Sequence, residues 1–133
     1  MSINKPYQTY QHNAVNTASS GELTLMLYNG CIKFIKQAMK DIENGKIEAK
    51  NTHLQKAQKI IQELMVTLDM NVEISTQIMP LYEYILHQLK EGNVKNDPAF
   101  LEEALKYVTE FRDTWKQVIK QARQTRYAQG AQV

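Results

Sequence analysis

Four long stretches of this chain carry hydrophobic residues at the spacing of an α-helix. They cover residues 19–43, 47–70, 72–91 and a last stretch from residue 98, and in each the apolar residues recur three or four positions apart. Because only a few residues connect one stretch to the next, consecutive helices should lie side by side and run in opposite directions. The sequence therefore predicts an all-α protein, an antiparallel up-down four-helix bundle without strands or internal repeats.

Local signals mark where the first helix begins and ends. Ser19 and Glu22 match a capping box, in which the serine oxygen accepts from a backbone amide and the glutamate reaches back to the N-cap amide. Asn44-Gly45 supplies the left-handed conformation that commonly ends a helix. We therefore expect the first helix over residues 19–43.

Prolines and glycines punctuate the second half of the chain. Pro80 removes an amide hydrogen inside the third stretch, which predicts a kink or a restart there, and Gly92-Asn93 is the expected stop. Asp97-Pro98 places a capping side chain before a proline at the first helical position. The fourth helix is expected to begin there, to extend for about seven turns and to fray in the final RQTRYAQGAQV.

The length of 133 residues fits one domain with a real hydrophobic core. We expect residues 1–16, which are polar, to form a mobile or loosely docked tail, residues 17–126 to form the bundle, and residues 127–133 to fray. The first residues lack the apolar core of a signal peptide, and no apolar run approaches the roughly 20 residues of a membrane span. The sequence favours the cytoplasm, without membrane insertion.

The first helix carries more apolar surface than one neighbour can cover. Leu23, Leu27, Cys31, Phe34 and Ala38 share one face. Further apolar side chains widen that face to an arc of about 200°, roughly twice that of a helix packed on one neighbour. This helix is therefore expected to make contacts on two sides.

No motif brings together groups for catalysis or metal binding. The three histidines, His12, His53 and His87, lie in separate segments. Glu83 and His87 have the wrong spacing for the Glu-x-x-His motif of di-iron bundles, and the chain has no phosphate loop, nucleophile elbow or cysteine pair. The single cysteine, Cys31, is expected in the core. The sequence predicts neither an enzyme nor a cofactor.

Two other functions stay open as alternatives. Lys116, Lys120, Arg123 and Arg126 form a basic run that could follow a phosphate backbone, although a net charge of +2 disfavours a nucleic-acid partner and a solvated face is the simpler interpretation. The surplus apolar surface could instead be the interface of a homodimer or a larger homo-oligomer.

Four sequence blocks occur in a recognisable order along nearly the whole chain. They are VNTASSGELTLMLYNGCIKFI, AQKIIQEL, LYEYI and FRDTW, one for each helix. In order and spacing they resemble the flagellin-export chaperone family known as FliS. Two stretches depart from the family's pattern: Ser20-Gly21, where a proline often follows the serine, and VEISTQIMP before Leu81.

The resemblance implies a cytoplasmic chaperone without catalytic activity or a required cofactor. Such a chaperone holds the disordered C-terminal segment of flagellin in apolar grooves, prevents its premature polymerisation and assists its delivery to the gate of the flagellar type III export apparatus. It also suggests that the tail around Tyr7 and Tyr10 covers part of the empty client site or contacts the export gate.

Candidate client contacts are apolar or aromatic residues that mostly lie at or beyond the edges of the central stripes. Core packing is the alternative for each of them. The candidates are Leu25, Tyr28, Ile32, Ile60, Val66, Tyr84, Leu86 and Tyr107.

Overall fold

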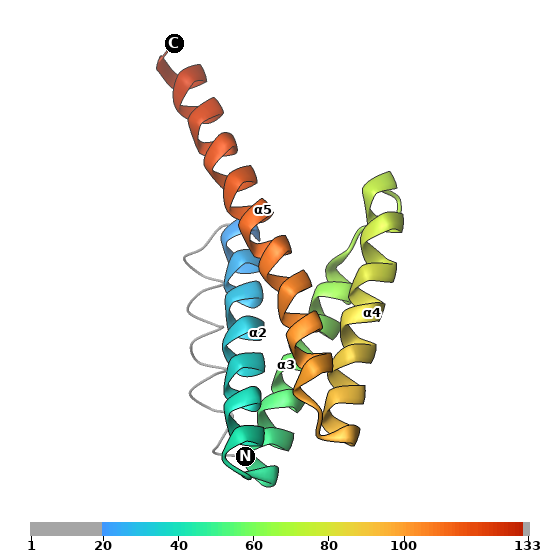
Figure 1. Ribbon diagram of the computed structural model, residues 1–133. Helices are drawn as coiled ribbons and strands as arrows, with labels where there is room; N and C mark the ends of the chain where they lie inside the picture. The colour runs from blue at the N-terminus through green and yellow to red at the C-terminus, as the bar shows by residue number, and fades with distance from the viewer. Residues whose placement is uncertain (1–19, 132–133) are drawn as a thin grey trace, which may run out of the picture.

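The computed structural model describes residues 20–131, and the side chains from residue 21 to residue 128. These residues form four α-helices and no strand: α2 (Ser20–Glu43), α3 (Ile47–Thr67), α4 (Glu73–Lys95) and α5 (Pro98–Ala131) (Figure 1). Each helix packs against two others, in the order α2, α3, α4, α5 and back to α2. Successive helices run in opposite directions, so the predicted antiparallel bundle is confirmed. The expected tail, with Tyr7 and Tyr10, lies outside the described residues.

The hydrophobic core lies between the four helices. All of them contribute fully buried side chains, and burying one Leu, Ile or Val stabilises the fold by about 1.5–3 kcal/mol. The largest are Ile35 of α2, Leu54, Ile60, Ile61 and Leu64 of α3, Ile85 and Leu89 of α4, and Leu101 and Val108 of α5. The helical stripes of the sequence are therefore the faces that meet in this core.

The first two connections are tight turns closed by backbone hydrogen bonds. Gly45 has φ +69°, and its amide donates to the Ile42 carbonyl at 3.2 Å, which confirms the predicted stop. In the second connection the Val72 amide donates to the Asp69 carbonyl and the Asn71 amide to the Asp69 carboxylate, both at 3.0 Å. This turn ends α3 at Thr67, three residues before the expected Met70.

Two predicted features of the third helix, a restart at Pro80 and a stop at Gly92-Asn93, can be compared with the structure. The helix continues through the exposed Pro80 without restarting, and it ends at Lys95 with Asn96 in the left-handed conformation, φ 52° and ψ 42°. The predicted stop at Gly92-Asn93 is therefore wrong. Gly92 is buried inside α4, where a Cβ atom would lie 2.5 Å from Leu101 Cδ2 of α5. Its role is to allow two helices to approach closely.

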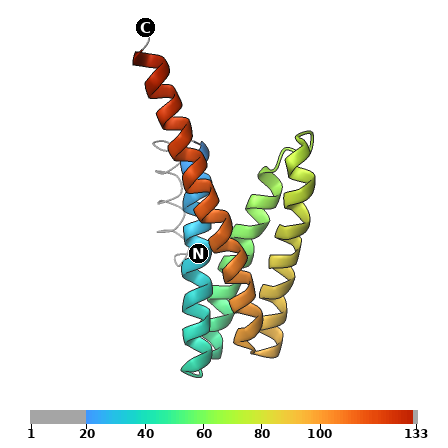
Figure 2. The same ribbon diagram turned by 45° about the horizontal axis from the view of Figure 1, so that its top comes forward.

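The last helix begins as predicted and extends further than predicted. The Asp97 carboxylate accepts from the Ala99 amide at 2.9 Å, which is the expected cap before Pro98. α5 is helical to Ala131, longer than the expected seven turns, and it extends beyond the N-terminal end of α2 (Figures 1 and 2). Its final residues are rich in Ala, Gln and Arg, which have high helix propensity. Fraying of residues 127–133 stays a prediction.

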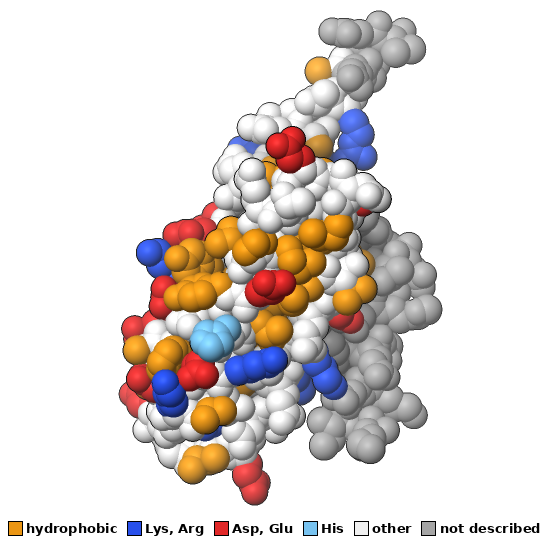
Figure 3. Space-filling model, turned by 90° about the vertical axis from the view of Figure 1, so that its right-hand side faces the viewer, with side chains coloured by type: hydrophobic (Ala, Val, Ile, Leu, Met, Phe, Trp, Pro, Cys, Tyr) orange, Lys and Arg blue, Asp and Glu red, His pale blue; other side chains and the backbone are white. Residues whose placement is uncertain are grey.

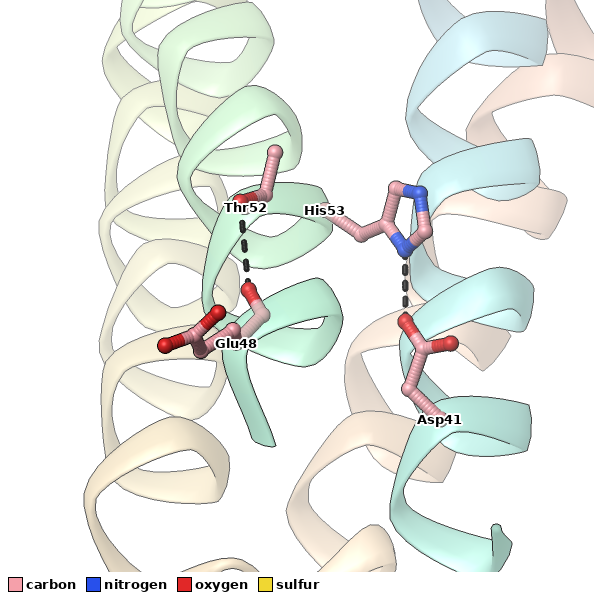
Figure 4. A network of polar contacts seen from close by, with 4 residues as sticks. All are labelled: Asp41, Glu48, Thr52 and His53. Atoms are coloured by element: carbon pink, nitrogen blue, oxygen red, sulfur yellow. Dashed lines mark hydrogen bonds and ion pairs between the residues drawn. The ribbon is translucent and has the colours of Figure 1, made fainter. Parts of the chain in front are cut away.

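Two polar contacts fasten the end of the bundle where α2 meets α3 and α4 meets α5. His53 Nδ1 of α3 lies 2.6 Å from Asp41 Oδ2 of α2 (Figure 4), and the His53 ring stacks on Phe34 at 6.2 Å. The buried Lys50 donates through Nζ to the Asn93 carbonyl and to Asn96 Oδ1, both at 3.0 Å. Lys50 thus supplies a cation to the C-terminus of α4, where the helix dipole is negative.

Gly92→Ala should lower stability because the added methyl group meets a side chain that has no room to move. Leu101 is 0% exposed, and overpacking of this kind costs about 1–3 kcal/mol, more than the gain in helix propensity. Urea denaturation measures the loss. Gly30→Ala is the matched control, because its Cβ would lie at an ordinary 3.4 Å from Ile60 Cδ1. Equal stability of both variants would contradict the close approach.

Cys31 should be unreactive in the folded protein. Its side chain is 0% exposed, and burial raises the pKa of the thiol to about 12. Because the thiolate is the nucleophile, an aromatic disulfide reagent at about pH 8 should modify Cys31 only as fast as the bundle opens. The reaction should become immediate in guanidinium chloride. Rapid modification under native conditions would show that this part of the core is accessible.

Candidate functional site, an apolar groove at the open end of the bundle

A large concave surface lies where the end of α3 and the start of α4 face the start of α2 and the middle of α5. Its cavity volume is about 640 Å³. We call this surface the open-end groove. Its lining is mostly apolar and aromatic and comes from all four helices: Thr24, Tyr28, Leu64, Thr67, Leu68, Ile74, Ile78, Leu81, Tyr82, Tyr107, Glu110, Phe111, Thr114, Trp115 and Val118.

The floor of the groove is an aromatic cluster with an internal hydrogen bond. The hydroxyl oxygens of Tyr28 and Tyr82 lie 2.6 Å apart, and both rings contact Phe111, with centroid distances of 5.9 and 5.3 Å. Desolvation by burial raises the pKa of both tyrosines above the ordinary value. The floor is therefore uncharged at neutral pH, and its two polar atoms satisfy each other.

The rim of the groove is exposed and apolar. Ile74 is 54% exposed, Leu81 40% and Val118 44%. Figure 3 shows hydrophobic side chains gathered in a band on the face that carries α4. A contiguous exposed apolar surface of this kind is a common feature of binding sites.

Trp115 closes one end of the groove and ties α5 to the beginning of α2. Its indole Nε1 donates to the Gly21 carbonyl at 2.7 Å. About two turns further along α5, Arg123 pairs with Glu22. Both contacts bridge residues that are far apart in the sequence, so they hold the groove walls in a fixed relation.

A second groove lies between α2 and α3, with a cavity volume of about 610 Å³. We call it the side groove. Leu23, Leu27 and Val66 supply its apolar surface, and Thr67 lines both grooves. The two grooves therefore meet at the end of α3, and an extended polypeptide could pass from one into the other.

The structure separates the candidate client contacts into three groups. Tyr28 and Tyr107 line the open-end groove, and Val66, at 85% exposure, lines the side groove. Ile32 and Ile60, with exposures of 5% and 2%, are core residues that line neither groove. Tyr28 is equally buried, at 4%, but it belongs to the lining of the open-end groove. The apolar faces of α2 and α3 extend to Ile32 and Ile60 because each of these helices packs on two neighbours.

The remaining three candidates lie elsewhere. Leu25 lines a small groove between α2 and the end of α5, and Leu86 is half-buried against the core. Tyr84, 38% exposed, packs edge-on against Tyr107 with a centroid distance of 5.7 Å. Its hydrogen bond to Glu103 raises the pKa of the Tyr84 hydroxyl. Client binding by all eight residues stays a prediction.

Several groove residues were not among the sequence candidates. Ile74, Leu81 and Val118 form the exposed rim, and Trp115 lies half-buried in the lining. Ile74 and Leu81 recur at the same helical spacing as the core residues of α4, so periodicity alone does not distinguish the rim from the core.

No group of three or more His, Cys, Asp or Glu side chains within the described residues is placed to hold a metal ion. None of the four described helices is long and apolar enough to cross a membrane.

The fold and this surface define a four-helix bundle with apolar grooves on its outside. The family model described as "Flagellar protein FliS" matches residues 3–122, and the chain belongs to this family. It is similar to two proteins named flagellar secretion chaperone FliS. The Bacillus subtilis one is 52% identical over 98% of both chains, and the Salmonella typhimurium one is 32% identical over 86% of this chain and 87% of its own.

A solved structure supports the same fold. The protein described as "Crystal structure of flagellar chaperone from bacteria" aligns with a TM-score of 0.72 and 18% sequence identity, over 88% of this chain and 97% of its own. The family model and the two relatives confirm the resemblance found in the four sequence blocks. Membership assigns the chain to a group of chaperones rather than enzymes.

Tyr28→Phe and Tyr82→Phe should each destabilise the bundle, because each leaves one buried hydroxyl without its partner. The expected loss is about 1–2 kcal/mol for either single variant. The double variant should lose clearly less than the sum, since no polar atom is then left unsatisfied. Urea denaturation of the four proteins gives the coupling free energy, and additive losses would contradict a direct hydrogen bond.

Proposed function

We propose that this protein is a cytoplasmic flagellar export chaperone that binds the disordered C-terminal segment of flagellin. The client lies in the open-end groove and continues into the side groove. Bound in this way, the segment is withheld from premature polymerisation until the complex reaches the gate of the type III export apparatus. The observation that carries the proposal is a pair of apolar grooves, adjoining at Thr67, on a bundle that belongs to the FliS family.

The chemistry of the open-end groove suits an amphipathic polypeptide. A disordered client loses conformational entropy when it orders, so it needs a large contact area, on the order of 1,000–3,000 Å². The exposed rim formed by Ile74, Leu81 and Val118 can receive apolar side chains, while Glu110 and Thr114 supply polar groups at its edge. Aromatic floors and apolar rims are typical of grooves that bind helices.

The surface also contains sites where a client can be fixed in register. Glu103 accepts from Gln88 at 3.0 Å and from the Tyr84 hydroxyl, close to the edge of the open-end groove formed by Tyr107. These polar groups are prearranged on α4 and α5, so little ordering is needed when a partner binds.

Calorimetric titration with the C-terminal segment of flagellin from the same organism tests the proposal. We expect saturable binding with a negative heat-capacity change and little dependence on salt, because the contact is apolar. Lack of binding by folded, monomeric protein would contradict the proposal. Association of the protein with itself through the same surface would favour the homodimer interpretation instead.

Replacing two rim residues should weaken the binding of the client without unfolding the protein. Ile74→Ser with Leu81→Ser removes exposed apolar surface, so client affinity should fall at least tenfold, about 1.4 kcal/mol or more, while the unfolding midpoint hardly changes. Val94→Ser is the matched control, because Val94 is 83% exposed near the other end of α4. Equal affinity of the rim and control variants would place the client elsewhere.

A further inference from the structure

The last part of α5 stands apart from the rest of the bundle (Figures 1 and 2). From residue 116 to residue 128 every side chain is exposed except the half-buried Ile119. We call residues 116–131 the arm. An isolated helix of this length is only marginally stable in water. A partner that packs along the arm would therefore stabilise its helical conformation.

The arm carries a charge opposite to that of the remaining chain. It contains four of the 16 basic residues, Lys116, Lys120, Arg123 and Arg126, and none of the 14 acidic ones. The rest of the chain therefore has two more acidic than basic residues. Arg123 pairs with Glu22, whereas the other three cations form no ion pair with another described residue.

A small groove lies at the root of the arm, between α2 and α5. Leu25 and Ile119 supply its apolar surface, and Lys116, Lys120 and Arg123 line it from α5. Its cavity volume is about 290 Å³, which accommodates one or two apolar side chains rather than a whole helix. It shares no lining residue with the open-end groove.

We propose that the arm and this root groove form a docking site for an acidic, amphipathic helical segment of a partner protein. Lys116, Lys120 and Arg123 follow one another at steps of four and three residues, so they lie in a row along one face of α5. Carboxylates at the same steps on a partner helix face this row, and an apolar residue beside them enters the groove between Leu25 and Ile119.

Other partners fit these features less well. A nucleic-acid backbone makes no use of the apolar surface that Leu25 and Ile119 supply to the root groove. An anionic membrane needs a broad apolar face, but the apolar stripe of α5 ends at Ala122 and Arg126 takes its next position. A second copy of this chain would bring two arms of like charge together.

A fluorescence-anisotropy titration of the full chain tests the proposal with a labelled synthetic helix. The probe carries glutamates four and three residues apart and leucines along the adjoining edge. We expect saturable binding that weakens as salt rises. Lys116→Glu with Lys120→Glu should reduce the affinity at least tenfold. Lys33→Glu with Lys40→Glu, on exposed positions of α2, makes the same change in net charge and should alter the affinity less than twofold.

Three results would overturn the proposal. Equal loss in the arm and control variants would mean that net charge alone attracts the probe. Unchanged affinity for a probe whose leucines are replaced by serine would remove the apolar groove from the site. Tighter binding of duplex DNA or of phosphatidylserine vesicles, abolished by the arm variant, would assign the arm to those ligands. Binding of flagellin's C-terminal segment should be unaffected by the arm variant, so the two proposals fail independently.

Discussion

The close contact between Gly92 of α4 and Leu101 of α5 determines how the bundle is shaped. With no side chain on Gly92, the two helices touch beside the short connection that joins them. Toward the other end of the molecule the helices separate (Figures 1 and 2), and the side chains there do not fill the space between them. One end is therefore packed like a protein core, and the other presents a groove. The Lys50 contacts with Asn93 and Asn96 strengthen the packed end, because they satisfy backbone and side-chain oxygens at the C-terminus of α4.

The groove persists because its floor has no unmet hydrogen-bonding requirement. Tyr28 and Tyr82 turn their hydroxyls toward each other, and their rings rest on Phe111. The planar rings and their one shared hydrogen bond define the surface of this floor. Trp115 adds a second fixed wall through its bond to the Gly21 carbonyl. The site on this bundle is thus made of the same residue types as its core, placed where the helices no longer meet.

Periodicity predicted the helices well because each has a continuous apolar stripe. Gly45 ends α2 and Asp97 caps the start of α5, both as expected. The sequence was less informative where one residue type serves two purposes. Gly92 has the features of a helix stop but is a packing position, and only the partner helix reveals this. Core and groove residues could not be separated in the sequence for the same reason. Ile32 and Tyr28 share a face of α2 and are both buried, and only the positions of the neighbouring helices decide that Tyr28 lines the open-end groove whereas Ile32 does not. α5 is longer than expected because the apolar stripe ends at Ala122, where Arg126 takes its next position, so periodicity did not indicate a continuing helix.

Trp115 is the only tryptophan in the chain, and it lies half-buried in the lining of the open-end groove. Its indole ring is held to the first turn of α2 by a hydrogen bond to a backbone carbonyl. Any ligand that displaces water from the groove, or any shift of α2 against α5, changes the polarity around that one ring. The protein consequently contains an intrinsic optical reporter of its own binding surface, whose emission follows occupancy of the groove without a label.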